Sequence, residues 1–135
     1  MSELDQICDE VMSNVQRCWT ETGGVPRVFH VYHGDGEHAD VMMMDPAISP
    51  EEARSIIRRY TRKVEAFAVA LVSEAVAIHQ KTGQVVDGVM VIVESQVGSR
   101  CFFWTVDSER ELRLMKKYIP QEGMTGWLDP SLIVN

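Results

Sequence analysis

The 135-residue chain is long enough to bury one hydrophobic core, and its 45% apolar and 24% charged residues are ordinary for a globular protein. Its formal net charge of −7 argues against nucleic-acid binding by the surface as a whole, although one basic face remains compatible with it. No apolar run approaches the ~20 residues of a membrane span, and the acidic N-terminus lacks the apolar core of a signal peptide. The three cysteines are not closely spaced, which favours free thiols in a reducing compartment. We therefore expect a single soluble, cytoplasmic domain over residues 1–135.

A first helix is predicted over Ser2–Thr22. Apolar residues recur there at intervals of three and four, so that they share one side of a helix. These positions are Leu4, Ile7, Cys8, Val11, Met12, Val15, Cys18 and Trp19. Gly23-Gly24 and then Pro26 mark the end of the helix.

Residues 27–33 and 38–44 are predicted to form a β-hairpin around the two-residue turn Asp35-Gly36, a dipeptide whose backbone preferences match the twist of paired strands. The expected register pairs His33 with His38, Val31 with Asp40 and Phe29 with Met42. Neither face of this hairpin is fully polar, so both are expected to be partly covered.

The stretch from Ser49 to Gly83 is predicted to be a single long helix. Ser49 can cap it, Pro50 suits the first helical position, and Glu52 completes a capping box. No Gly or Pro interrupts the segment before Gly83, which is typical of a C-terminal stop. Helical spacing is seen at Ala53, Ile56, Ile57, Tyr60, Val64, Phe67, Ala68, Leu71, Ala75 and Ile78.

Such a helix would outgrow its own domain. It would be about 48 Å long, whereas a compact domain of this size has a diameter of roughly 36 Å. The overhang would carry Ile56, Ile57 and Tyr60, and a second copy in a twofold dimer is the simplest cover for it. We therefore expect a homo-oligomer; the alternative is a monomer in which the C-terminal residues cover the helix.

The remaining elements are a second hairpin, a third helix and an apolar tail. Val85–Val97 and Arg100–Val106 are expected to pair around Gly98-Ser99, with Val93 opposite Trp104. A capping box at residues 108–111 begins a helix that ends before Pro120, and the large apolar residues of 121–135 are expected to dock on the body or on a partner. The predicted fold class is α+β in the order α-β-β-α-β-β-α, with two antiparallel hairpins, in one sheet, packed on a long central helix.

Three ionisable residues share one face at the tip of the first hairpin. Two imidazoles and a carboxylate, from His33, His38 and Asp40, could hold zinc or a similar ion. No recognised metal-binding spacing accompanies them, and polar turns are common. The favoured interpretation is a solvated turn, with no metal and no cofactor.

Two carboxylates fall on otherwise apolar surfaces. Glu74 lies on the apolar side of the long predicted helix, and Glu94 lies on a half-apolar strand face. A buried carboxylate must find donors or become protonated, and two of them could serve as a general acid and base. They are the candidate catalytic residues; the alternative is that each is structural, bonded to backbone, Arg or Tyr.

One face of the long predicted helix is basic. Arg54, Arg58 and Arg62 recur every four residues and could bind a phosphate-rich or acidic partner. The alternative is a solvated face that forms ion pairs with neighbouring carboxylates.

The motifs LVSEAV at residues 71–76 and MVIVE at residues 90–94 resemble a family of small uncharacterised bacterial and phage proteins. In that family, a helix ending in Ser-Glu-Ala precedes a strand ending in Glu. The resemblance covers about a third of the chain and implies no activity.

Three functions are compatible with these patterns. The preferred one is a non-enzymatic protein-interaction or accessory domain that associates with itself and with a protein partner, because no catalytic motif is present. The second is a small metal-dependent or carboxylate-based hydrolase that uses the residues named above. The third is a nucleic-acid or nucleotide binder that uses the basic helix face.

Overall fold

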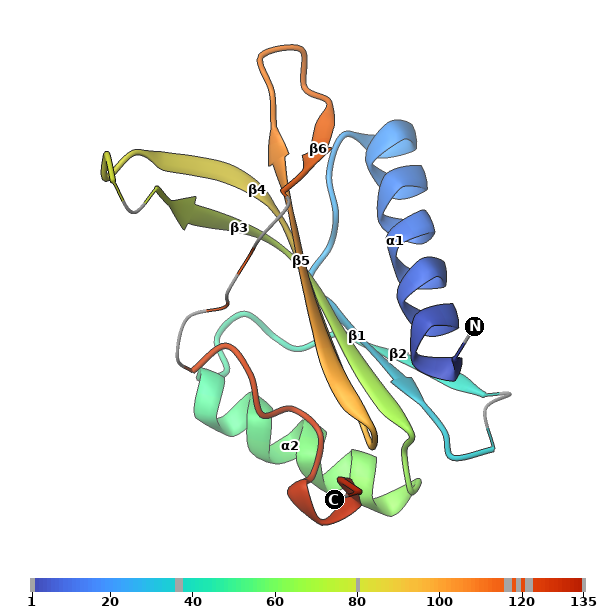
Figure 1. Cartoon of the computed structure of the whole chain (residues 1–135). Coiled ribbons are helices and arrows are strands. Elements are labelled where there is room, and N and C mark those ends of the chain that lie inside the picture. The colour runs from blue at the N-terminus through green and yellow to red at the C-terminus, as the bar shows by residue number, and fades with distance from the viewer. Residues whose placement is uncertain are drawn as a thin grey trace.

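The computed structural model describes residues 2–35, 38–79, 81–115, 118, 120 and 123–134. In this part of the chain there are two α-helices, α1 (Glu3–Thr22) and α2 (Pro50–Lys63), and a short 3-10 helix, η1 (Pro130–Leu132). The strands are β1 (Val28–Tyr32), β2 (Ala39–Met42), β3 (Ala68–Ile78), β4 (Val85–Ser95), β5 (Gly98–Val106) and β6 (Leu112–Leu114). They form one antiparallel sheet in the order β2-β1-β3-β4-β5-β6, which confirms the α+β class (Figure 1).

The sheet has a covering layer on each face. Helix α1 covers one face, and α2 together with residues 123–134, here called the C-terminal segment, covers the other (Figure 1). Because successive side chains of a strand point to opposite faces, neighbouring residues of β3 and β4 belong to different cores. The α1 core contains Ala68, Ala70, Val72, Val89, Val91 and Val93, and the α2 core contains Val69, Leu71, Met90 and Ile92.

Helix α1 begins and ends where the sequence predicts. The side chain of Ser2 accepts a hydrogen bond from the Asp5 amide at 3.1 Å, and Gly23 ends the helix with a φ of 74°, a value that favours glycine. The apolar side of α1 is buried against the sheet, which confirms the first predicted helix.

The first hairpin has the predicted register. Phe29 pairs with Met42 and Val31 with Asp40, and the His33 amide donates to the His38 carbonyl at 2.8 Å. The strands are shorter than predicted. The structure therefore confirms the predicted strand pairing, whereas Gly36 of the predicted turn lies outside the described residues.

The prediction of one helix from Ser49 to Gly83 is wrong. Its start is correct, since Ser49 caps α2 and Pro50 is the first residue, but α2 ends at Lys63. The chain then turns through Glu65, whose φ of 51° is left-handed, and continues as β3. At 14 residues, α2 is about 21 Å long, so the overhang on which the expected dimer depended does not exist.

Burial on both sides of the chain explains this error. Strand β3 is central in the sheet, between β1 and β4, and Ala68–Val72 are all buried because both faces are covered. A doubly covered strand has a continuous apolar run, and periodicity alone does not distinguish such a run from a buried helix. The β-branched residues Val69, Val72, Val76 and Ile78 favour the strand.

The second hairpin has the predicted faces but a different register. Trp104 pairs with Val89 rather than with Val93, a displacement of four residues along β4. The turn is centred on Gln96-Val97, where the Ser95 hydroxyl donates to the Gly98 carbonyl at 2.7 Å and accepts the Val97 amide at 3.2 Å. An even displacement keeps each side chain on its predicted face.

The predicted third helix is absent from the described residues between 108 and 118. The chain forms a tight turn in which Asp107 accepts the amides of Glu109 and Glu111, both at 2.9 Å, and Arg110 has a φ of 64°. It then adds β6 to the edge of the sheet. The Asp107 carboxylate therefore caps a turn at the place where the sequence pattern favoured a helix start.

The C-terminal segment docks on the body, as one of the two predicted alternatives required. Trp127 and Leu128 are buried in the α2 core, and Met124 and Leu132 pack against it. Neither α-helix of the described chain has the length and apolarity that a membrane-crossing helix requires.

We expect Cys8 to resist alkylation in the folded protein at pH 8. Its side chain is buried under α1, and burial raises the pKa of its thiol to about 11, so that about one molecule in a thousand carries the reactive thiolate. Modification by iodoacetamide, followed by peptide mass spectrometry, should be at least about tenfold slower at Cys8 than at Cys18, which is only partly buried. Both cysteines should react alike in urea; equal rates in the native state would contradict the burial of Cys8.

Candidate functional site

The outer ends of β3 and β4 extend beyond the rest of the sheet. Strand β1 pairs with β3 only along Ala68–Val72, and the pairing of β4 with β5 stops at Gly88. Residues 73–78 and 85–88, here called the β3–β4 arm, therefore project from the body, with residues 75–78 paired to residues 85–88 (Figure 1). Within the described chain, no strand pairs with the outer edge of β3 from Ser73 to Ile78.

One face of this arm is apolar and open to solvent. Val76 and Ile78 are each 55% exposed, and Val85, which pairs with Ile78, is 60% exposed. By strand alternation they continue the face on which α1 packs. Large apolar side chains that are adjacent and exposed are typical of interaction surfaces.

The structure does not bring the two candidate catalytic carboxylates together. Glu74 belongs to the α1 face of the sheet and is exposed, and its carboxylate accepts the Val25 amide at 3.4 Å. Glu94 belongs to the α2 face. Since the sheet separates them, they cannot act as an acid and base on one substrate.

Glu94 instead holds the C-terminal segment. Its two carboxylate oxygens accept the amides of Gly126 and Trp127 at 2.7–3.3 Å. Hydrogen bonds to a charged acceptor are stronger than neutral ones. The backbone partners of this half-buried carboxylate therefore agree with a structural role for Glu94.

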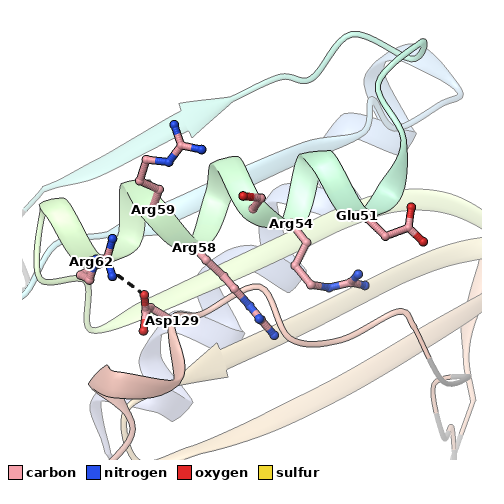
Figure 2. Close-up of a pocket in the computed structure, with 7 residues that line it drawn as sticks. Glu51, Arg54, Arg58, Arg59, Arg62 and Asp129 are labelled. Atoms are coloured by element: carbon pink, nitrogen blue, oxygen red, sulfur yellow. Dashed lines mark ion pairs between the residues drawn. The ribbon is translucent and has the colours of Figure 1, made fainter.

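The predicted basic face of α2 lines an open groove of about 410 Å³. Figure 2 shows Arg54 and Arg58 pointing toward the C-terminal segment and Arg62 beside Asp129, whereas Arg59 points away from that segment. The lining residues are Glu51, Arg54, Ser55, Arg58, Arg59, Arg62 and Asp129. The groove therefore combines four guanidinium groups with two carboxylates.

Two of these arginines bind the C-terminal segment. Arg54 Nε donates to the Thr125 carbonyl at 3.0 Å, and its guanidinium lies over the Trp127 ring, 4.8 Å from the centroid. Its Nη2 donates to the Gly123 carbonyl. Arg58 Nε donates to the Gly126 carbonyl at 2.6 Å. These contacts fix the two side chains against the C-terminal segment.

The other two arginines are less constrained. Arg62 Nε lies 3.9 Å from Asp129 Oδ2 and is largely exposed (Figure 2). Asp129 caps η1, and hydrogen bonds from Ser131 hold the pKa of its carboxyl below the usual range. Among the described residues, Arg59 makes no hydrogen bond or ion pair.

The hairpin-tip residues form two hydrogen-bonded pairs, and the His33 and His38 rings lie side by side with their centroids 5.9 Å apart. His33 Nε2 lies 2.6 Å from Asp40 Oδ2, and the Tyr60 hydroxyl donates to the same oxygen. His38 Nδ1 lies 2.7 Å from Asp35 Oδ2. Among the described residues, no group of three or more His, Cys, Asp or Glu side chains is arranged to hold a metal ion.

Asp40 ties β2 to α2 through these contacts. The Tyr60 hydroxyl, and next the His33 ring, lower the pKa of the Asp40 carboxyl, and Asp40 in turn raises the pKa of Tyr60. Sequence reasoning placed Tyr60 on the apolar side of a helix and did not connect it with Asp40. Their contact depends on where α2 crosses the sheet, which no local pattern encodes.

The contribution of the C-terminal segment to the groove was also not predicted from the sequence. The Asp129-Pro130 pair is typical of a helix start and could have indicated the cap that Asp129 forms. The backbone carbonyls that bind Arg54 and Arg58 leave no sequence signal. Comparison of the chain with protein-family models, curated proteins and solved structures gave no match.

Proposed function

We propose that this protein is a non-enzymatic interaction domain that self-associates through its β3–β4 arm. The observation that supports this most strongly is the unpaired edge of β3 from Ser73 to Ile78, next to the exposed side chains of Val76, Ile78 and Val85. An unpaired edge presents backbone donors and acceptors in the spacing that another strand requires.

This edge has only one of the features that normally prevent strand addition, a single charged side chain. Natural sheets protect their edges with lysine, proline, bulges or covering elements. Residues 73–78 contain no lysine and no proline, and Glu74 is their only charged residue. Pairing with another strand is therefore opposed by the desolvation of the Glu74 carboxylate, which accepts the Val25 amide, and by the loss of freedom on association.

A second copy of the chain suits this edge because the arm is self-complementary. Antiparallel pairing about a twofold axis at Val76 would place this residue opposite its own copy and would extend two sheets into one. The same pairing would cover Val76 and, in part, Ile78. Full burial of each such side chain contributes about 1.5–3 kcal/mol, so even partial burial of several of them favours association.

We expect the double substitution Val76→Lys with Ile78→Lys to weaken self-association at least about tenfold, because it places positive charges on the pairing edge. Both side chains are exposed in the monomer, so the fold should be retained. Sedimentation equilibrium over a range of concentrations measures the association constant, and circular dichroism checks the fold.

The matched control is Val41→Lys on β2, which is the edge strand next to β1. Val41 is 62% exposed and lies on an outer strand, yet it is outside the arm. It should leave the association constant unchanged. A wild-type protein that is monomeric at every concentration, or a doubly substituted protein that associates as strongly as wild type, would refute the proposal.

A further inference from the structure

The groove between α2 and the C-terminal segment carries positive charge on a negative protein. Four arginines and two carboxylates line it, a surplus of two positive charges, whereas the whole chain has a net charge of −7. A local surplus of this kind concentrates anions at one place on the surface.

Several arginine donors in the groove are unused. Within the described chain, Arg58 donates only through Nε, so its two terminal nitrogens are available. Arg59 has no partner there, and Arg62 is only loosely paired with Asp129 at 3.9 Å. Arg58 and Arg62 are one helical turn apart, which puts their side chains on the same side of α2.

The contacts of Arg58 also pre-organise the site. Its bond to the Gly126 carbonyl holds the guanidinium at the groove wall, and Gly126, with a φ of 90°, lets the backbone come close. A Cβ at position 126 would lie 2.8 Å from Arg58 Nη2. A guanidinium that is already ordered loses less conformational freedom when it binds a ligand.

We propose that this groove binds a doubly charged phosphate group of a small molecule, with Arg58 and Arg62 as its anchors and Arg59 as an additional donor. A phosphate monoester carries a charge of about −1.5 to −2 at pH 7, which matches the surplus in the groove. The planar fork of arginine fits phosphate oxygens through two parallel hydrogen bonds.

The groove does not favour a nucleic-acid strand. Single-strand binding requires exposed aromatic rings on which bases stack. The nearby ring of Trp127 is buried and covered by Arg54, and no aromatic side chain is among the lining residues. The contacts available are therefore those of a phosphate group and not of a base.

The test is a titration of the protein with inorganic phosphate, glycerol phosphate and a short single-stranded oligonucleotide, followed by the Nε–H signals of arginine in NMR spectra. We expect both small phosphates to shift the Arg58 and Arg62 signals and to saturate on the order of 1 mM. Binding should be weaker at pH 5.5 than at pH 7.5, because the second phosphate pKa is near 6.

Two neighbouring positions on α2 provide a matched pair. Arg62→Gln should weaken binding of glycerol phosphate about tenfold, whereas Lys63→Gln, which removes the same charge outside the groove, should change it less than about twofold. Asp129→Asn should strengthen binding about threefold, because it removes a competing carboxylate while asparagine can still cap η1.

Each of three results would overturn the proposal. These are the absence of a saturable shift at the arginine signals, equal weakening by Arg62→Gln and Lys63→Gln, and tighter binding of the oligonucleotide than of either small phosphate. Glycerol phosphate binding more tightly than inorganic phosphate would identify an esterified ligand, and the reverse order would identify the free ion. Neither order depends on the association of the β3–β4 arm.

Discussion

Replacing Trp127 with alanine is expected to lower the free energy of unfolding by about 3–5 kcal/mol, the usual range for deletion of a buried indole. The Trp127 ring is 3% exposed and packs against Phe29, with ring centroids 4.8 Å apart. Arg54 stacks on it and would lose this partner. The α2 core would therefore lose a large apolar side chain and its contact with the Arg54 guanidinium. Urea unfolding followed by circular dichroism measures the resulting change in the free energy of unfolding.

The contribution of the Trp127 ring to stability can be measured separately from that of the backbone hydrogen bonds to Glu94. Glu94 binds the amide of residue 127, not its side chain, so the substitution leaves these hydrogen bonds intact. Ile133→Ala, in the same segment but 46% exposed, is the control and should change stability by less than about 0.5 kcal/mol. Equal stability of Trp127→Ala and wild type would mean that the C-terminal segment does not cover the sheet in solution.

Replacing Gly88 with alanine is expected to destabilise the protein by about 3 kcal/mol or more, at the upper end of the effects of overpacking. A Cβ at this position of β4 would overlap the Trp104 carbonyl oxygen and the Phe103 ring. The carbonyl belongs to the backbone of β5 and cannot move independently of the sheet. Glycine is needed here because the neighbouring strand comes so close.

Gly24→Ala is the control for this substitution. Its added methyl would meet only the Glu74 carboxylate, at an ordinary 3.5 Å, so the change in stability should stay below about 1 kcal/mol. Thermal unfolding of both variants provides the comparison. A Gly88→Ala protein as stable as the Gly24→Ala protein would show that β5 does not approach β4 at this point.

Elements specified by local chemistry were predictable from the sequence. The helix end at Gly23, the cap at Ser49 and the register of the first hairpin each depend on a few neighbouring residues, and the structure confirms them. The faces of β4 and β5 were also predictable, because alternation depends only on parity along the strand.

Elements that depend on distant partners were not predictable. Residues 68–78 form a strand because β1, β4 and two covering layers surround this segment, and none of these is visible in its own sequence. The capping pattern at Ser108 does not begin a helix, because the Asp107 carboxylate accepts the amides of Glu109 and Glu111 and holds the chain in a turn.

The candidate functional sites were likewise predictable only in their local features. The basic face of α2 was predictable from the sequence because a four-residue spacing is a local property, and Arg54, Arg58 and Arg62 all lie within α2. The roles of these arginines were not visible, since they depend on carbonyl oxygens about 70 residues later in the chain. The separation of Glu74 from Glu94 follows from the strand that replaced the predicted helix.

The order of the strands bears on how the chain folds. Every neighbouring pair in the sheet is adjacent in sequence except β1 and β3, which enclose β2 and α2 between them. The four hairpins of neighbouring strands can therefore form early, whereas joining β1 to β3 requires the closure of a loop of about 40 residues. This closure unites the two halves of the sheet, so we expect it to determine the rate at which the native state forms.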